Sequence, residues 1–209
     1  MKKLAILTIC SYVFAITSSA QNITDSRQDV IDSTGSGFIS NPTNLPFFNS
    51  TSNAEKIIAD ILDALGMQGN FKIKIADVPN AEATIRHHER YILYNPDFVN
   101  KVNTVTKNKW ASIFILAHEV AHHLEGHTLT YVKNRPDVEL QADEFAGYTL
   151  YKMGATLQQA QLAMYYIASA DATKTHPARV DRLAAIAKGW NKANTQTKSP
   201  VSDIHPTSI

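Results

Sequence analysis

The chain has 209 residues, of which 44% are hydrophobic and 19% are charged, proportions typical of a soluble globular protein with one domain, or one domain plus tails. Its 20 basic and 19 acidic residues leave a formal net charge of +1, which indicates no basic surface for binding nucleic acid. A single cysteine, Cys10, excludes a disulfide within the chain.

The first twenty residues have the pattern of a secretory signal peptide. Lys2 and Lys3 give a basic start, residues 4–17 form an apolar run, and small residues end at Ala20. The alternative is an uncleaved anchor, but the run is shorter than the roughly 20 residues that a spanning helix needs. Cleavage after Ala20 leaves 209 − 20 = 189 residues and removes the cysteine. We expect an exported protein, periplasmic or secreted, with no stable membrane insertion after cleavage.

The next part of the chain predicts a leader, one helix and a few strands. Residues 21–52 are rich in Ser, Thr, Asn, Gly and Pro, which predicts a flexible leader or a pro-segment. A helix is predicted from Asn53, because isoleucines and leucines then recur on one face, and Gly66 is its natural stop. Residues 71–75 alternate apolar and basic side chains, as a half-buried strand does. Residues 82–96 predict two further short strands around a polar turn.

Four helices are predicted in the second half of the chain. They are expected over residues 107–125, 136–153, 156–170 and 177–190, with Pro136 and Pro177 at first positions, Thr156 as an N-cap, and Gly126 and Gly154 just beyond two of the ends. The polar tail, residues 191–209, is predicted to be disordered. A small sheet followed by helices is an α+β fold, with one domain over residues 53–190.

The segment FILAHEVAHHLEGH, residues 114–127, contains four of the eight histidines. His118, Glu119 and His122 form the pattern H-E-x-x-H. Positions i and i+4 of a helix lie on one face, so His118 and His122 can bind the same metal ion. Glu119 is rotated by about 100° from His118, so it is free to hold the attacking water instead. His123 points away from His122, and we interpret it as a residue at the edge of the core.

A catalytic zinc ion needs a third protein ligand and one open position. The extended pattern H-E-x-x-H-x-x-G-x-x-H fails here, because Gly126 and His127 are each one place off. His127 is therefore interpreted as a supporting or packing residue. Glu139 and Asp143 are one turn apart on the next predicted helix, and Glu139 lies between apolar neighbours. An antiparallel helix would place Glu139 as the third ligand and Asp143 as the partner of a ligand histidine.

These residues resemble a known family. HEVAHHLEGH (118–127) with ELQADEFAGYTLYKMG (139–154), THPARVDRL (175–183) and PNAEATI (79–85) is similar to the HtpX-like and CAAX-prenyl-protease type of gluzincin metallopeptidase. The resemblance covers residues 53–190 and implies a zincin-like fold, with a small β-sheet followed by a helical bundle that carries the HExxH helix and the ExxxD helix. It also matches His176, Pro177 and Arg179 or Arg182 to an HP…R segment. Unlike its membrane relatives, this chain has no membrane helices, and the segment from His122 to Glu139 is short.

The resemblance implies a zinc-dependent endopeptidase that hydrolyses peptide bonds through a metal-activated water, with one Zn²⁺ per chain. Glu119 would move the proton. His176 would stabilise the oxyanion, or occupy the open zinc position and hold the enzyme inactive. Peptide or unfolded protein would bind as an added strand along an edge formed by Glu82, Ala83, Thr84 and Ile85. The expected setting is protein quality control outside the cytoplasm.

The alternative is a non-catalytic metal-binding or chaperone-like module on the same scaffold. It accounts for the ligands but leaves Glu119 without a purpose, since binding alone does not need it. The sequence therefore favours the enzyme.

Overall fold

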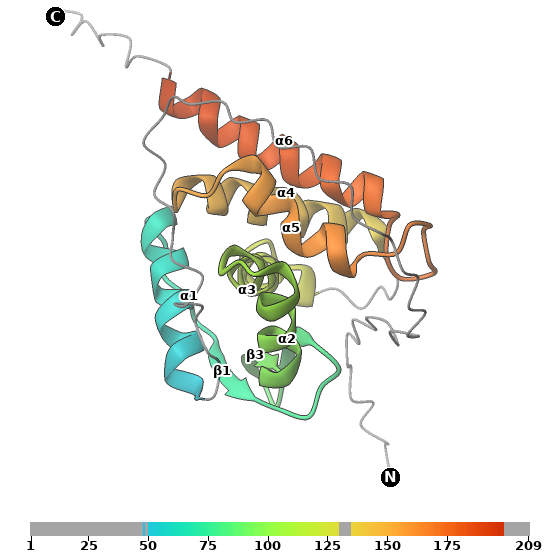
Figure 1. The fold of residues 1–209 in the computed structure, drawn as a ribbon. Helices are drawn as coiled ribbons and strands as arrows, with labels where there is room; N and C mark the ends of the chain where they lie inside the picture. Colours follow the sequence, from blue (N-terminus) through green and yellow to red (C-terminus); the bar gives the residue numbers. More distant parts are fainter. Residues whose placement is uncertain (1–47, 49, 130–134, 199–209) are drawn as a thin grey trace, which may run out of the picture.

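The computed structural model describes residue 48 and residues 50–129 and 135–198, and within them the fold is α+β, with a three-stranded sheet and six α-helices (Figure 1). The predicted signal peptide, most of the predicted leader and the end of the tail lie outside these residues. The α+β class is therefore confirmed for the described residues.

The first helix, α1 (Thr51–Leu65), begins two residues before the predicted start. Ser50 precedes it in extended conformation, and Asn53 lies in its first turn. Its apolar face packs into the core as predicted, with Ile58 and Ile61 buried. Gly66 ends the helix with φ +63°, a left-handed conformation that favours glycine. Helix α1 therefore includes residues 51 and 52, the last two residues of the predicted leader.

The sheet consists of β1 (Lys72–Ile75), β2 (Ala81–Arg86) and β3 (Glu89–Tyr94), in the order β1-β3-β2. β3 pairs in parallel with β1 and antiparallel with β2, so β2 has no second strand partner among the described residues. The turn between β2 and β3 contains His87 and His88, both with positive φ. The three predicted strands are confirmed, and β2 lies at an edge.

The predicted helix 107–125 corresponds to α3 (Trp110–Leu124), and a separate helix, α2 (Pro96–Thr106), lies before it. Helix α2 is capped by Asn95, whose side chain accepts two backbone hydrogens, and it ends at Lys107 with φ +49°. Asn108 then accepts the N–H of Trp110 and starts α3. A 3-10 turn (His127–Leu129) follows. The predicted start at residue 107 is therefore three residues early, because the capping side chain of Asn108 precedes the helix.

The last three helices are α4 (Pro136–Lys152), α5 (Leu157–Ile167) and α6 (Arg179–Lys198). The predicted Thr156 cap is confirmed as a full capping box. The predicted disordered tail is wrong over residues 191–198, because α6 continues to Lys198. This extension packs against α4, where Tyr148 and Tyr151 bond to Gln196 and Asn194.

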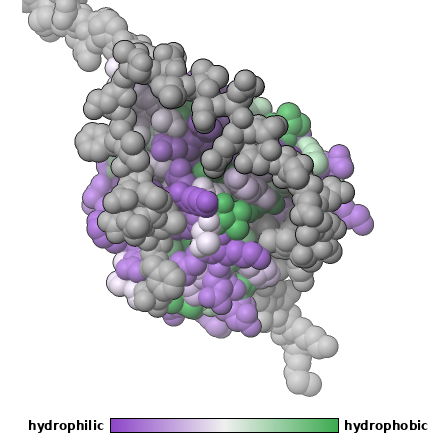
Figure 2. Space-filling view, in the orientation of Figure 1, coloured by the Kyte–Doolittle hydropathy of each residue, from purple (hydrophilic) through white to green (hydrophobic). Residues whose placement is uncertain are grey.

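Helix α3 lies at the centre of the fold (Figure 1), with α4, α5 and α6 on one side and the sheet, α1 and α2 on the other. Thirteen of its residues, Ala111 to His123, are buried. On the face seen in Figure 2, most coloured residues are hydrophilic, and a smaller hydrophobic group lies near the centre. Within the described residues, no helix is long and apolar enough to cross a membrane. The burial of α3 and the elements that pack against it show that the core is built around the helix that carries H-E-x-x-H.

Candidate metal centre

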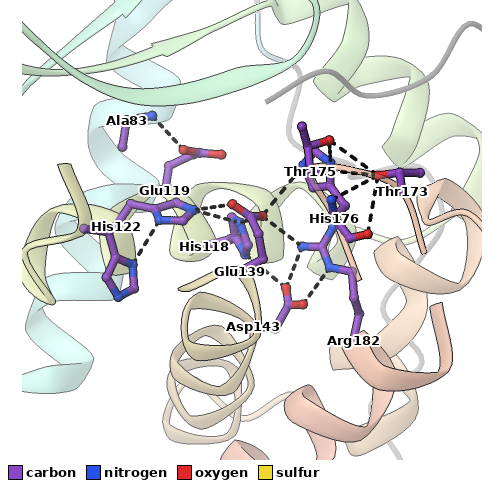
Figure 3. Close-up of polar contacts among 11 residues, drawn as sticks. Ala83, His118, Glu119, His122, Glu139, Asp143, Thr173, Thr175, His176 and Arg182 are labelled. Atoms are coloured by element: carbon purple, nitrogen blue, oxygen red, sulfur yellow. Dashed lines mark hydrogen bonds and ion pairs between the residues drawn. The ribbon is translucent and has the colours of Figure 1, made fainter. Parts of the chain in front are cut away.

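His118, His122 and Glu139 form a compact buried cluster, with each residue no more than 7% exposed. The two histidines come from α3 and the glutamate from α4, which packs against it (Figure 3). One ligand atom from each residue lies within 4.8 Å of the others. The group can therefore hold a metal ion.

The spacing of these donor atoms fits a tetrahedral ion. His118 Nε2 and His122 Nε2 are 3.1 Å apart. Glu139 Oε2 lies 3.4 Å from His118 Nε2, and Glu139 Oε1 lies 3.6 Å from His122 Nε2. Ligands about 2.0–2.1 Å from a tetrahedral zinc ion are about 3.4 Å from one another. Glu139 Oε2 is buried and accepts no hydrogen bond from a described residue. A buried carboxylate oxygen without a hydrogen bond is costly, and a bound cation would satisfy it.

Charge in the cluster also favours a cation. Burial disfavours a charged imidazole at His118, but Asp143 and Glu139 outweigh it and raise the pKa of His118 to about 10. Burial and the neighbouring His118 lower the pKa of His122 to about 3. Burial opposes the Glu139 carboxylate too, yet His118 outweighs it and holds the pKa of Glu139 far below its usual value. The Asp143 and Glu139 carboxylates thus favour positive charge at the cluster, which a metal cation would supply.

Each histidine has a different partner behind it. His118 Nδ1 lies 3.0 Å from Asp143 Oδ1. Arg182, from α6, donates to both oxygens of Asp143, at 2.6 and 2.8 Å, and lies 3.9 Å from Glu139 Oε2. Asp143 is fully buried, so its charge depends on these contacts. This arrangement fixes the His118 tautomer with Nδ1–H facing Asp143 and Nε2 facing the cluster.

His122 is supported by a second histidine. Its Nδ1 lies 3.0 Å from His127 Nδ1, and His127 Nε2 lies 3.0 Å from Gln141 Oε1. The glutamine oxygen can only accept, so His127 donates from Nε2 and accepts at Nδ1. His122 then donates from Nδ1 and presents Nε2 to the cluster. His127, 7% exposed, therefore contacts both His122 and Gln141, and the sequence did not predict Gln141.

Glu119 follows His118 on α3 and lies beside the cluster of His118, His122 and Glu139 (Figure 3). Its Oε2 accepts the backbone N–H of Ala83 on β2 at 2.7 Å. Burial raises the pKa of Glu119 to about 7. Its carboxyl group is thus held between the histidines and the strand edge, and it can gain or lose a proton near neutral pH.

His176 lies on the segment between α5 and α6, and its Nε2 is 3.8 Å from Glu139 Oε2. Its backbone N–H donates to Thr173 Oγ1, and its Nδ1 lies 2.8 Å from Thr175 Oγ1. Burial lowers the pKa of His176, so the imidazole is neutral at pH 7. If the Thr175 hydroxyl donates to Nδ1, the proton on Nε2 faces the cluster.

The other predicted residues have different surroundings. Glu82 and Thr84 are buried, and Glu82 pairs with Arg86 at 2.7 Å. His123 is 1% exposed, stacks on Phe71 and contacts the Tyr91 carbonyl oxygen at 2.9 Å. The sequence interpretation of His123 as a residue at the core edge therefore understates its burial.

The sequence did not predict the contact of Gln141, and it left open which of two arginines reaches the site. Gln141 contacts His127 across 14 residues, and no local pattern marks it. The resemblance left Arg179 and Arg182 as alternatives, and only Arg182 reaches the site, because Arg179 donates to the Ala168 carbonyl oxygen. Helical phase does not separate them, since residues three apart lie on the same face of a helix; Arg179 is the first residue of α6, and Arg182, almost one turn further on, is the one that is buried beside Asp143.

Comparison of the chain with models of known protein families, with curated proteins and with solved structures gives no match.

Proposed function

We propose that this chain is a zinc-dependent endopeptidase with a zincin-like fold, of the HtpX-like gluzincin type that its motifs resemble. The observation that carries the proposal is the convergence of His118 Nε2, His122 Nε2 and the Glu139 carboxylate, with Glu119 adjacent to them. Two imidazoles and one carboxylate leave one coordination position open, as catalytic zinc sites do. A binding site alone would not need the Glu119 carboxyl group at this position.

A zinc ion held by His118, His122 and Glu139 would supply a Lewis acid that polarises the scissile carbonyl and makes water a stronger nucleophile at neutral pH. Glu119 Oε2 accepts the Ala83 amide hydrogen, so we assign the proton transfer to Oε1. Glu119 orients the attacking water, takes its proton and passes it to the leaving amide nitrogen. Burial keeps bulk water from competing for this carboxyl group.

His176 completes the site from the opposite side. Its neutral imidazole can donate from Nε2 to the carbonyl oxygen as negative charge develops there. The hydrogen bonds between Thr173, Thr175 and His176 hold the ring in this orientation (Figure 3). The same geometry also suits the alternative that His176 binds the metal in a resting state.

The edge of β2 that pairs with no strand among the described residues supports peptide as the substrate class. Ala83 directs its N–H away from β3 and toward Glu119, and strand residues two apart face the same way, so Ala81 and Ile85 share this edge. A peptide can extend the sheet there through main-chain hydrogen bonds. The N-terminal pattern of residues 1–20 supports export, and we propose unfolded proteins outside the cytoplasm as substrates.

The test measures metal content and hydrolysis together. Purified chain should contain one zinc ion, cleave casein, lose cleavage when a chelator removes zinc, and regain it on addition of equimolar zinc. Stoichiometric zinc without cleavage of casein or of a broad peptide library would instead support the non-catalytic metal-binding module.

A further inference from the structure

A chain of three side chains leads from the metal cluster to the protein surface. His122 Nδ1 lies 3.0 Å from His127 Nδ1, and His127 Nε2 lies 3.0 Å from Gln141 Oε1. The two histidines are buried, whereas Gln141 is exposed on α4. Gln141 is thus linked to the ligand His122 through His127.

We propose that Gln141 is a positioning residue of the metal centre, which fixes the tautomer of His127 and thereby leaves His122 Nε2 free to bind the ion. The inference rests on the proposed function, because it concerns the same metal site. Each nitrogen of a neutral imidazole either donates or accepts, so the hydrogen bonds along the chain all run in one direction. The amide oxygen accepts from His127 Nε2, and His127 Nδ1 accepts from His122 Nδ1. The lone pair of His122 Nε2 then faces the cluster.

The opposite direction of the same chain of hydrogen bonds excludes a metal ion. If the amide nitrogen of Gln141 faced His127, it would donate to Nε2, and the His127 proton would lie on Nδ1. His127 would then donate to His122 Nδ1. The His122 proton would occupy Nε2, the nitrogen that faces His118 Nε2 and Glu139 Oε1. A protonated ring nitrogen does not bind a metal ion, so zinc affinity depends on an acceptor at position 141.

A second acceptor lies near His127, at a longer distance. Glu125 Oε2 is 3.5 Å from His127 Nε2, whereas the Gln141 oxygen is 3.0 Å away. Hydrogen bonds from N–H to oxygen usually span about 2.7–3.2 Å, so Gln141 is the acceptor of this proton. Substitution of Gln141 should therefore weaken zinc binding more than the same substitution of Glu125.

The first measurement is the zinc affinity of the purified chain in a chelator competition. Gln141→Leu removes the acceptor and should weaken zinc binding roughly 3- to 10-fold, the effect of one hydrogen bond. Gln141→Glu keeps an acceptor and should bind zinc at least as tightly as the unaltered chain. Glu125→Leu should weaken zinc binding by less than about 2-fold. Gln158→Leu, at an exposed position of α5, is the matched control and should leave the affinity unchanged.

The second measurement is nitrogen NMR of the histidine rings, which reports the tautomer with and without zinc. We expect the His127 proton on Nε2 in the unaltered chain and in Gln141→Glu, and a mixture of both tautomers in Gln141→Leu. A purely structural role of Gln141 would lower the melting temperature without moving these signals.

Three results would overturn the proposal. They are a His127 proton on Nδ1 in the unaltered chain, equal zinc affinities of Gln141→Leu and Gln158→Leu, and a larger loss of affinity in Glu125→Leu than in Gln141→Leu. An unaltered chain that binds no zinc would instead refute the proposed function, and this inference with it.

Discussion

Arg182 supports a strong prediction about stability, because it is the cationic partner of a fully buried carboxylate. It is 5% exposed and donates two hydrogen bonds to Asp143, at 2.6 and 2.8 Å. Arg182→Met removes the charge and leaves Asp143 with His118 alone. Removing one partner of a buried ion pair costs about 3–5 kcal/mol, a large part of the roughly 5–15 kcal/mol that holds a domain folded.

The assay is urea unfolding at pH 7 with the zinc concentration held constant, together with thermal melting. A loss of that size lowers the melting temperature by about 6–20 °C in a protein of this length. Arg179→Met is the matched control, because Arg179 is on the same helix and donates to the uncharged Ala168 carbonyl oxygen. We expect that control to lose only about 1–2 kcal/mol.

A second substitution separates the ion pair from packing. Replacing Asp143 by asparagine in the Arg182→Met background removes the unpaired negative charge. The double variant should therefore be less destabilised than the sum of the two single variants. Equal losses of unfolding free energy for Arg182→Met and Arg179→Met would refute this account of the Arg182–Asp143–His118 contacts. So would a double variant whose loss equals the sum of the losses of Arg182→Met and Asp143→Asn.

Three further outcomes follow from the site and the packing. Zinc at about 100 times its dissociation constant should stabilise the folded protein by about 2.7 kcal/mol. This gain should raise the melting temperature by roughly 5–11 °C, and no rise would contradict a zinc site in the folded protein. His127→Ala should weaken zinc binding about 10–100-fold in a chelator competition, whereas His87→Asn at the exposed turn should not. Gly189→Ala should destabilise the fold by about 1–3 kcal/mol, although alanine has a better helix propensity than glycine. The new methyl group would overlap the Glu144 carbonyl oxygen where α6 crosses α4. Asn191→Ala, exposed on the same helix, should change unfolding little, and equal effects of these two substitutions would disprove the close crossing.

Local periodicity is enough to predict the elements that carry the site. The i, i+4 spacing of His118 and His122 brings both rings to one side of a helix whatever surrounds it. Glu139 required a further assumption, that the next helix returns alongside the first, and the structure has α4 packed against α3. The three strands follow equally well from alternation and from the turn at His87 and His88.

Contacts between distant segments account for what the sequence did not predict. Gln141 reaches His127 only because α4 folds back over the 3-10 turn. Residues 191–198 look like a polar tail by composition, yet they are helical because α4 offers partners such as Tyr148 and Tyr151. A hollow beside His118 and Glu139 brings together Phe98, Phe114 and Met164 from three helices, and no pattern within one segment marks them as neighbours.

The central claim is that Glu119 moves the proton while His118, His122 and Glu139 hold the metal. The most direct measurement compares Glu119→Gln with the unaltered chain for zinc content and for casein cleavage, side by side. The account predicts one zinc ion in both proteins and cleavage reduced by at least about 100-fold in Glu119→Gln. Cleavage by Glu119→Gln at the unaltered rate, with zinc fully bound, would contradict it.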